Sequence, residues 1–493
     1  MGRIVKLSSV ERFDGAVDVI VCGLGGAGVC AALEASAAGS SVLVLERFSA
    51  GGGSTQMSAC EMYLGGNGGT TLQRELGFED SSKNFRNYLE ACFGDHADPA
   101  KVDAFVDGAA EHFDWMEAQG VPYKRAYFDG RDVVALTGDS LQYTGNERAW
   151  PFTERSAAVP RGHLPADAGH SGGKVLMGVL LENAQTSTGI TIRCDARVRS
   201  LIVDDAGVVC GVAAKIDNRL HHFFAHQGVV LSAGGFIMNE QMTRQHIAGL
   251  DACAMRHGNP GDTGDGILLG TAAGGHAINM GEAFVCVAHY PPSQLTFGIF
   301  VNEQGQRFLN EDTYLARMGD AVMRQTNQRA FMFIDNRNFA RPAYQEHAQI
   351  VAVGETVEEV ERESGLPSGA LQQTVAFYNA HAANGQDPLF HKHADWLLPF
   401  DEPPFALVDY SLATLRPAVF TLGGLDTLPS GEVLTPDREI IAGLYAAGRT
   451  AAGIPRTSAG YASGMSVADA TFTGRRAGRA AAGRERRPSP EGV

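Results

Sequence analysis

Three glycines and one acid have the spacing of a site that binds an adenine dinucleotide. Gly23, Gly25 and Gly28 form the pattern G-x-G-x-x-G, and Glu46 follows roughly 20 residues later. In such a site the first glycine allows a tight turn, the second lets the backbone approach a pyrophosphate, and the third lets a helix pack closely on a strand. Glu46 is placed to accept a hydrogen bond from a ribose hydroxyl. We therefore predict that this segment binds a dinucleotide.

The elements that must position these residues can be identified from the hydrophobic pattern. Residues 17–22 are an apolar strand, residues 29–38 a helix, and residues 41–45 a second apolar strand that ends at Glu46. The unpaired N–H groups and the positive end of the helix dipole then face the phosphates. This strand–helix–strand unit makes the glycine pattern far more specific than it would be alone.

The segments after Glu46 distinguish between dinucleotides. Residues 51–59 and 65–69 are rich in glycine, and the first also carries hydroxyl side chains. NAD-binding units normally continue directly into another helix and strand, whereas flavoproteins use such a stretch beside the isoalloxazine ring. A flexible surface loop is the alternative. Distant glycine-containing segments favour the flavin; they are residues 228–235, 264–266, 443–449 and 460–467.

Together these segments resemble the FAD-binding signature of the fumarate reductase/succinate dehydrogenase flavoprotein superfamily, over residues 17–478. The resemblance implies an α/β chain, α+β overall, in which a Rossmann-like FAD-binding domain carries an inserted α+β catalytic (capping) domain. It implies non-covalent FAD, because residues 51–59 contain no histidine. The implied cofactor-binding residues are Gly23, Gly25, Gly26, Ala27, Gly28, Glu46, Arg47, Ser54, Thr55, Ser58, Ala59, Val198, Ala233, Gly234, Asp265, Gly448, Arg449, Met465, Ser466 and Val467.

Members of this superfamily that act on C4 dicarboxylates need cationic side chains for two carboxylates, and this chain departs from that pattern. Tyr314 and Leu315 stand where an arginine acid is expected, Phe420 replaces a histidine, and Tyr461 replaces a further arginine. A dicarboxylate buried without these partners would cost several kcal/mol. We therefore expect a neutral, apolar substrate.

Residues 311–314, 421–425, 446–449 and 460–464 look like the corresponding segments of the flavin-dependent 3-ketosteroid dehydrogenases, most of all the Δ4-(5α) enzymes. The resemblance implies that Tyr461 and a backbone N–H near Gly464 hold the steroid O3, with Phe420 as a further substrate residue. Tyr314 and Ser463 are the implied candidates for accepting the C4 proton, while C5 gives a hydride to flavin N5. The N-terminus of the helix after Met465 would face the O2/N1 side of the flavin.

Other functions stay open at this point. A Δ1-dehydrogenase shares the tyrosine chemistry, and a fumarate reductase-like enzyme or a flavin carrier without a substrate fits less well. The histidines His221, His222 and His226 favour a partly exposed strand over a metal site, so we predict no metal. The segment Gly172-Gly173-Lys174 lacks the spacing of a phosphate loop.

Composition sets limits on partners and location. The chain has 493 residues, with 40 basic and 56 acidic side chains that give a formal net charge of −16, which argues against nucleic acid. Its eight cysteines show no C-x-x-C spacing, and no apolar run is long enough for a membrane span. We expect a cytoplasmic enzyme with a steroid substrate and an unidentified electron acceptor.

The motifs also divide the chain. We predict the first part of the FAD-binding domain at residues 1–284, the inserted domain at 285–412, the second part at 413–483, and a disordered tail at 484–493. Helices are expected at 98–120, 356–364, 369–383 and 467–482, a hairpin at 202–212, and strands at 298–301 and 331–334.

Overall fold

The computed structural model describes residues 3–250 and 255–489, and its largest element is a mixed β-sheet. Strand β11 (Arg219–Leu231) links two parts of this sheet. Its first half pairs antiparallel with β10, its last residues pair parallel with β22, and residues 223–231 pair parallel with β2. The other strands are β1 (Arg3–Lys6), β2 (Gly15–Cys22), β3 (Val42–Leu45), β8 (Ile190–Arg193), β9 (Arg197–Val203), β10 (Val209–Ile216), β21 (Glu432–Leu434) and β22 (Ile440–Ala446).

The predicted strand–helix–strand unit is present at the centre of this sheet. Strands β2 and β3 pair in parallel, and helix α1 (Gly26–Ala37) connects them. The helix begins three residues earlier than the hydrophobic pattern indicated, so Gly28 lies within its first turn. A Cβ on Gly28 would lie 1.9 Å from the carbonyl oxygen of Gly23, which explains why only glycine fits there.

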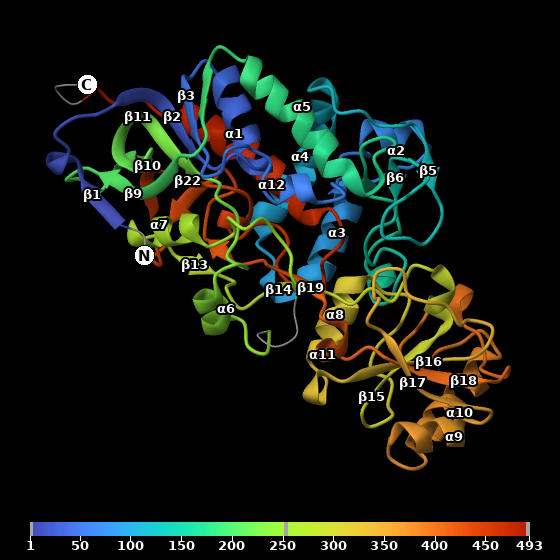
Figure 1. Ribbon diagram of the computed structural model, residues 1–493. Helices are drawn as coiled ribbons and strands as arrows, with labels where there is room; N and C mark the ends of the chain where they lie inside the picture. Colours follow the sequence, from blue (N-terminus) through green and yellow to red (C-terminus); the bar gives the residue numbers. More distant parts are fainter. Residues whose placement is uncertain (1–2, 251–254, 490–493) are drawn as a thin grey trace.

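Helix α12 (Met465–Ala482) packs along α1, although more than 400 residues of sequence separate them, and both lie near the centre of the molecule in Figure 1. Two glycines allow the close approach. A Cβ on Gly474 would lie 2.2 Å from the carbonyl oxygen of Ala27, and a Cβ on Gly478 would lie 2.2 Å from that of Ala31. The N-termini of both helices therefore reach the same cavity.

A helical layer and a small sheet cover the region next to this unit. The helices are α3 (Ser82–Phe93), α4 (Pro99–Ala118) and α5 (Gly172–Thr186), and the sheet contains β4 (Met62–Tyr63), β5 (Tyr127–Phe128), β6 (Leu141–Gln142) and β7 (Gly162–His163). Asp98 caps α4 by accepting from the N–H of Lys101, at the position where the sequence predicted a helix start.

The chain between residues 299 and 409 forms a separate antiparallel sheet, which we call the second sheet, seen at the lower right of Figure 1. Its strands are β15 (Ile299–Asn302), β16 (Ala330–Ile334), β17 (Gln349–Gly354) and β18 (Phe405–Asp409), with α9 (Val357–Ser364) and α10 (Ala370–Ala382) beside them. Strands β14 (Ala283–Cys286) and β19 (Ala418–Thr421) pair with each other where the chain enters and leaves this part. The domain boundaries themselves stay an interpretation.

The disorder of the tail stays a prediction, and the first residues of the tail contact the large sheet. Arg484 donates to the carbonyl oxygen of Gln227, the N–H of Arg487 donates to that of His226 at 2.9 Å, and Arg486 lies 2.8 Å from Asp18. These residues of the tail thus bond to backbone carbonyl oxygens of β11 and pair with Asp18 of β2. Residues 490–493 lie outside the described part. None of the helices in the described residues combines the length and apolar character that crossing a membrane requires.

Candidate active site

A cavity of about 620 Å³ runs from the glycine motif after β2 to strands β14 and β19. One end is formed by the turn between β2 and α1, the loop 54–59 and the ends of strands β3 and β11. The other end is formed by β14, by the residues before α8 (Leu315–Met323) and by those before α12. The cavity thus joins the two regions to which the sequence assigned a cofactor and a substrate.

The glycine end has the properties of a phosphate-binding turn. Gly23 has φ +109°, and Gly25 caps α1 without a side chain. A Cβ on Gly25 would meet only the Cα of Gly53, at 3.9 Å, so the backbone of Gly25 is open to the cavity. Because the first N–H groups of a helix have no partner within it, an anion at this position would be stabilised.

Glu46 lies at the end of β3, and 7% of it is exposed. Its carboxylate accepts from the N–H of Leu24 at 2.8 Å and from that of Phe48 at 2.9 Å. These bonds fix both oxygens beside the glycine turn and leave further lone pairs for a hydroxyl donor. The position is the one that the sequence predicted for a ribose contact.

The hydroxyls of the loop after Glu46 line the cavity, but they also stabilise its walls. Thr55 Oγ1 accepts from the N–H of Gly26 at 3.3 Å, Ser54 donates to Asp262 at 2.7 Å, and Ser58 donates to the carbonyl oxygen of Thr55. The loop is therefore a well-ordered part of the cradle, and the alternative of a flexible surface loop is wrong.

Arg449 and Asp262 form an ion pair in the cavity wall, at 2.6 Å. The other terminal nitrogen of Arg449, Nη1, is buried without a partner among the described residues, and so is the Ser466 hydroxyl oxygen at the start of α12. Unpaired buried donors of this kind are costly unless a ligand satisfies them. Together with the open backbone at Gly25, they fit a bound FAD.

The opposite end of the cavity is aromatic. Phe284 on β14 stacks on Phe420 on β19 with ring centroids 4.5 Å apart, and Tyr461 packs against Phe284 at 4.8 Å. Tyr314 lies beside Tyr461, with centroids 6.5 Å apart. This arrangement brings together all three positions at which the sequence replaces cationic side chains, and it provides a surface for a flat apolar molecule.

The two tyrosine hydroxyls in this end keep their protons. Burial raises the pKa of Tyr461 to about 12, and burial raises the pKa of Tyr314 well above its ordinary value. The Tyr461 oxygen accepts from the N–H of Ser466 at 3.2 Å, which leaves the Tyr461 proton for donation. Both side chains are therefore suited to donate hydrogen bonds to a ligand oxygen, and neither is suited to act alone as a base at neutral pH.

Ser463 lies between these tyrosines and a carboxylate that the sequence analysis missed. Its hydroxyl donates to Oε2 of Glu61, and Gln142 donates to Oε1 of the same side chain at 2.5 Å. Gly464 makes this approach possible, since it has φ +91° and a Cβ there would lie 2.8 Å from the carbonyl carbon of Glu61. The signal that could have revealed Glu61 is a single acid within the apolar run Ala59-Cys60-Glu61-Met62-Tyr63.

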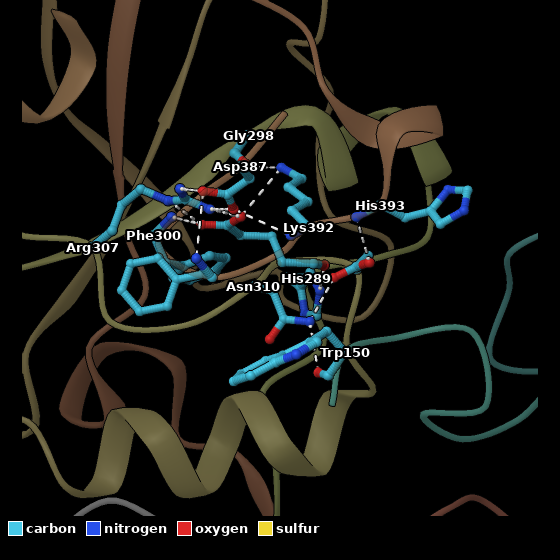
Figure 2. A network of polar contacts seen from close by, with 12 residues as sticks. Trp150, His289, Gly298, Phe300, Arg307, Asn310, Asp387, Lys392 and His393 are labelled. Carbon is cyan, nitrogen blue, oxygen red and sulfur yellow. Dashed lines mark hydrogen bonds and ion pairs between the residues drawn. The ribbon is translucent and has the colours of Figure 1, made fainter. Parts of the chain in front are cut away.

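A network of buried charges fixes the segment that carries Tyr314 (Figure 2). Arg307 lies 2.8 Å from Glu311 and 3.0 Å from Asp387, and Lys392 lies 3.3 Å from Glu311. Burial alone would raise the pKa of Glu311, but Arg307 and Lys392 hold it below its ordinary value. Tyr314 itself is bound through its N–H, which donates to the Asn146 side chain at 2.8 Å.

Most of the predicted site residues line this single cavity. Two do not: Gly28 packs against the β2–α1 turn, and Met465 is buried with its sulfur accepting from the N–H of Ala462. Arg47 and Asp265 do line the cavity, although they also face each other at 3.6 Å. Those that line it are Gly23, Gly25, Gly26, Ala27, Glu46, Arg47, Ser54, Thr55, Ser58, Ala59, Val198, Ala233, Gly234, Asp265, Tyr314, Phe420, Gly448, Arg449, Tyr461, Ser463, Gly464, Ser466 and Val467.

Several lining residues had no counterpart in the sequence analysis. Besides Glu61 and Asp262, they include His170 and Tyr344, whose side chains are 3.0 Å apart, and Phe284. Tyr344 belongs to the part of the chain with the second sheet, and His170 precedes α5. These contacts join segments that are distant in sequence, so no local pattern could indicate them.

Comparison with known proteins places this geometry in context. Residues 18–464 match the family model described as FAD binding domain. The crystal structure of a 3-ketosteroid-delta4-(5alpha)-dehydrogenase from Rhodococcus jostii RHA1, in complex with 4-androstene-3,17-dione, is 38% identical with a TM-score of 0.90, and the match covers 98% of this chain and 100% of that chain.

Two curated relatives differ in what they act on. The 3-oxo-5-alpha-steroid 4-dehydrogenase of Comamonas testosteroni is 26% identical over 91% of this chain and 96% of that protein. The fumarate reductase (cytochrome) of Shewanella frigidimarina is 27% identical over 94% of this chain and 77% of that protein. The overall sequence identities are too similar to distinguish a steroid dehydrogenase from a fumarate reductase. The distinction therefore depends on the residues at the aromatic end of the cavity.

Proposed function

Because the chain belongs to the FAD binding domain family, we propose that it is an FAD-dependent 3-oxo-5α-steroid 4-dehydrogenase. It removes two hydrogens from C4 and C5 of a 3-keto-5α-steroid and produces a 3-keto-4-ene steroid. The observation that carries this proposal is the aromatic end of the cavity, where Tyr314, Tyr461 and Phe420 occupy positions that a dicarboxylate enzyme needs for cations.

The cofactor is FAD, and the residues around the glycine turn would hold it. The N-terminus of α1 and the backbone of Gly25 would bind the diphosphate, and Glu46 the ribose. Arg449 and Ser466 would offer their unpaired buried groups to it. When bound, FAD accepts the hydride that leaves C5 of the steroid.

The protein side chains handle the steroid oxygen and the C4 proton. Tyr461 donates a hydrogen bond to O3, which acidifies C4 because negative charge develops on this oxygen as the proton leaves. Ser463 and Tyr314 are the two hydroxyls available to take that proton, one as its acceptor and the other as a relay. The flat rings of Phe284 and Phe420 bury the steroid skeleton and exclude water from the reacting carbons.

The experiment that tests the proposal is anaerobic mixing of the yellow holoenzyme with single candidate substrates. We expect 5α-androstane-3,17-dione to bleach the flavin absorption and to yield the 4-ene product, whereas succinate leaves the spectrum unchanged. Bleaching by 4-androstene-3,17-dione instead, with a double bond formed at C1–C2, would identify a Δ1-dehydrogenase. Bleaching by succinate would overturn the proposal.

We further propose a cytoplasmic location. The support is that the seven cysteines in the described residues are all free and that burial raises the pKa of Cys22 and Cys286 to about 12, so that they are unreactive thiols. Cell fractionation with detection of the steroid-dependent activity tests this. The electron acceptor that reoxidises the flavin stays unidentified.

A further inference from the structure

Among the described residues, Glu61 is the one carboxyl group at the aromatic end of the cavity, and it lacks the ion-pair partners that the buried acids Asp80 and Glu311 have. It is 3% exposed and lies at the end of the loop that leads into β4. Asp80 pairs with Arg161, and Glu311 pairs with Arg307 and Lys392. No cation in the described part of the chain forms an ion pair with Glu61. A buried carboxylate without a counterion is costly, and such a group in a cavity is a candidate for chemistry.

The hydrogen bonds of Glu61 connect it to the proposed reaction. The Ser463 hydroxyl donates to Oε2, and the Gln142 amide donates to Oε1 while also bonding the carbonyl oxygen of Val133 at 3.1 Å. Gln142 lies on β6 and so provides a fixed second contact. The carboxylate is thereby aimed at the Ser463 oxygen, which itself faces the cavity.

The hydroxyl groups at this end of the cavity are weak proton acceptors, so Glu61 can hold a proton that they cannot keep alone. A serine hydroxyl is a weak base unless a neighbouring group takes its proton, and the buried tyrosines keep theirs. The pKa of Glu61 is raised to about 8, mainly by burial. The hydrogen bonds from Ser463 and Gln142 lower this pKa, and the charges of Glu147 and Asp132 raise it. Tyr290, Tyr314, Tyr344, Tyr461 and Cys60 also lie within its electrostatic reach. Glu61 therefore changes its charge close to neutral pH.

We propose that Glu61 is the group that finally receives the proton removed from C4, through the hydroxyl of Ser463. The C4–H bond breaks as the Ser463 oxygen takes this proton, and the original Ser463 proton passes to Oε2 of Glu61. Ser463 ends neutral, Glu61 ends protonated, and the electron pair of the C4–H bond becomes the new double bond while C5 loses its hydride. The inference rests on the proposed function, and it assigns the acceptor role to Ser463.

The experiment compares wild-type holoenzyme with Glu61→Gln and with Glu147→Gln. Glu147 is a matched control, because it is also a buried carboxyl with a raised pKa, but its carboxylate accepts from the N–H of Gly145 and it does not line the cavity. The first readout is the anaerobic rate of flavin reduction by 5α-androstane-3,17-dione at pH values on both sides of 8. Since the base must be ionised, the wild-type rate should rise with pH through this range.

The second readout does not depend on turnover. Enzyme whose flavin has been reduced beforehand cannot accept a hydride, so incorporation of deuterium from D2O at C4 of the same steroid isolates the proton step. Mass spectrometry and proton NMR give its rate and position. We expect wild-type and Glu147→Gln enzyme to exchange C4, with the rise moved to lower pH in Glu147→Gln because that charge no longer raises the pKa of Glu61. Glu61→Gln should be at least about 100-fold slower in both readouts, without the pH-dependent rise and with unchanged steroid affinity.

The outcomes separate the two proposals. Exchange and flavin reduction by Glu61→Gln at the wild-type rate, with the same pH profile, would overturn the role of Glu61 and leave the proposed function intact. Equal losses in Glu61→Gln and Glu147→Gln would also overturn it, because they would point to a general packing effect. A wild-type enzyme that neither exchanges C4 nor reduces its flavin with the steroid would overturn the proposed function itself.

Discussion

At the scale of single residues, the aromatic end of the cavity contains proton donors and one acceptor of suitable strength. Burial raises the pKa of Tyr461 to about 12 and that of Glu61 to about 8. Because the folded protein holds the Glu61 proton more tightly than the unfolded chain does, this group makes stability fall as the pH rises from 4.5 towards 8. The free energy of unfolding falls by up to about 1.4 kcal/mol per pH unit in this range. A functional role for Glu61 would explain why the protein keeps a group that lowers its stability.

The first prediction at this scale concerns Tyr461→Phe. The hydrogen bond to O3 strengthens as charge develops in the transition state, so its loss should slow flavin reduction by a 5α-3-ketosteroid by about 10²–10³-fold. Steroid binding should persist, because affinity comes mainly from burial of the apolar skeleton at about 25 cal/mol per Å². Stopped-flow reduction and equilibrium titration with 4-androstene-3,17-dione measure the two effects separately.

A suitable control is Tyr410→Phe. Tyr410 is fully buried against Phe300 in the part with the second sheet, does not line the cavity, and has a hydroxyl without a partner among the described residues. Its variant should reduce its flavin at the wild-type rate. If Tyr461→Phe did so as well, the role of Tyr461 at O3 would be disproved.

At the scale of elements, the contact between α1 and α12 sets the geometry of the cofactor end. Each helix begins at the cavity, α1 after Gly25 and α12 after Gly464, and the two glycines Gly474 and Gly478 bring the helix backbones together. Each helix N-terminus contributes its dipole to the same space. Their separation therefore controls both the cradle for FAD and the position of Ser463, which lies just before α12.

We predict that Gly474→Ala lowers stability by roughly 1–3 kcal/mol and weakens FAD retention. The added Cβ would lie 2.2 Å from the carbonyl oxygen of Ala27, so α1 and α12 must move apart. Gly178→Ala is the control, since a Cβ at this exposed position inside α5 meets nothing within 4 Å. There the higher helix propensity of alanine should stabilise the protein by about 0.5–1 kcal/mol.

Thermal unfolding and the flavin content of the purified variants measure these changes. If Gly474→Ala kept wild-type stability and flavin content, the close contact between α1 and α12 would not limit the side chain at this position, and the prediction would be wrong. Loss of stability in Gly178→Ala would instead show that glycine substitutions in this protein act through something other than helix packing.

The same elements show which features the sequence could predict. The unit from β2 to β3 and helices α4, α9, α10 and α12 follow from local periodicity, capping and glycine spacing, and their ends agree within a few residues. Tyr314 and Tyr461 were identified by resemblance to a family. Glu61 was missed because it acquires its role only through Ser463, 402 residues away in the chain. The contacts of the tail could not be predicted, because its composition says nothing about the partners that Gln227 and Asp18 provide.

At the scale of the whole molecule, the cavity walls come from nearly every part of the chain. The glycine turn, the loop 54–59, the helix α7 (Asp265–Ala272), the segment before α8, and the residues from Gly448 to Val467 all line it. Tyr344 and His170 also connect the part with the second sheet to the FAD-binding part across the cavity. A cofactor that fills this space should therefore stabilise the entire fold and not only the glycine turn.

The last prediction follows from this arrangement. The loop 51–59 contains no histidine, so acid precipitation should release free FAD, and adding FAD to the apoprotein should raise its melting temperature. Glu46→Ala should reduce both flavin content and this thermal shift, because it removes the ribose contact and the acceptor for the N–H groups of Leu24 and Phe48. Turnover per bound flavin should stay close to wild type, since Glu46 is remote from Tyr461 and Ser463.

Asp205→Ala, in the exposed turn between β9 and β10, is the control and should change none of these quantities. Flavin that stays with the precipitated protein would contradict non-covalent binding, and an equal loss of turnover per flavin in Glu46→Ala would contradict a role confined to holding the cofactor.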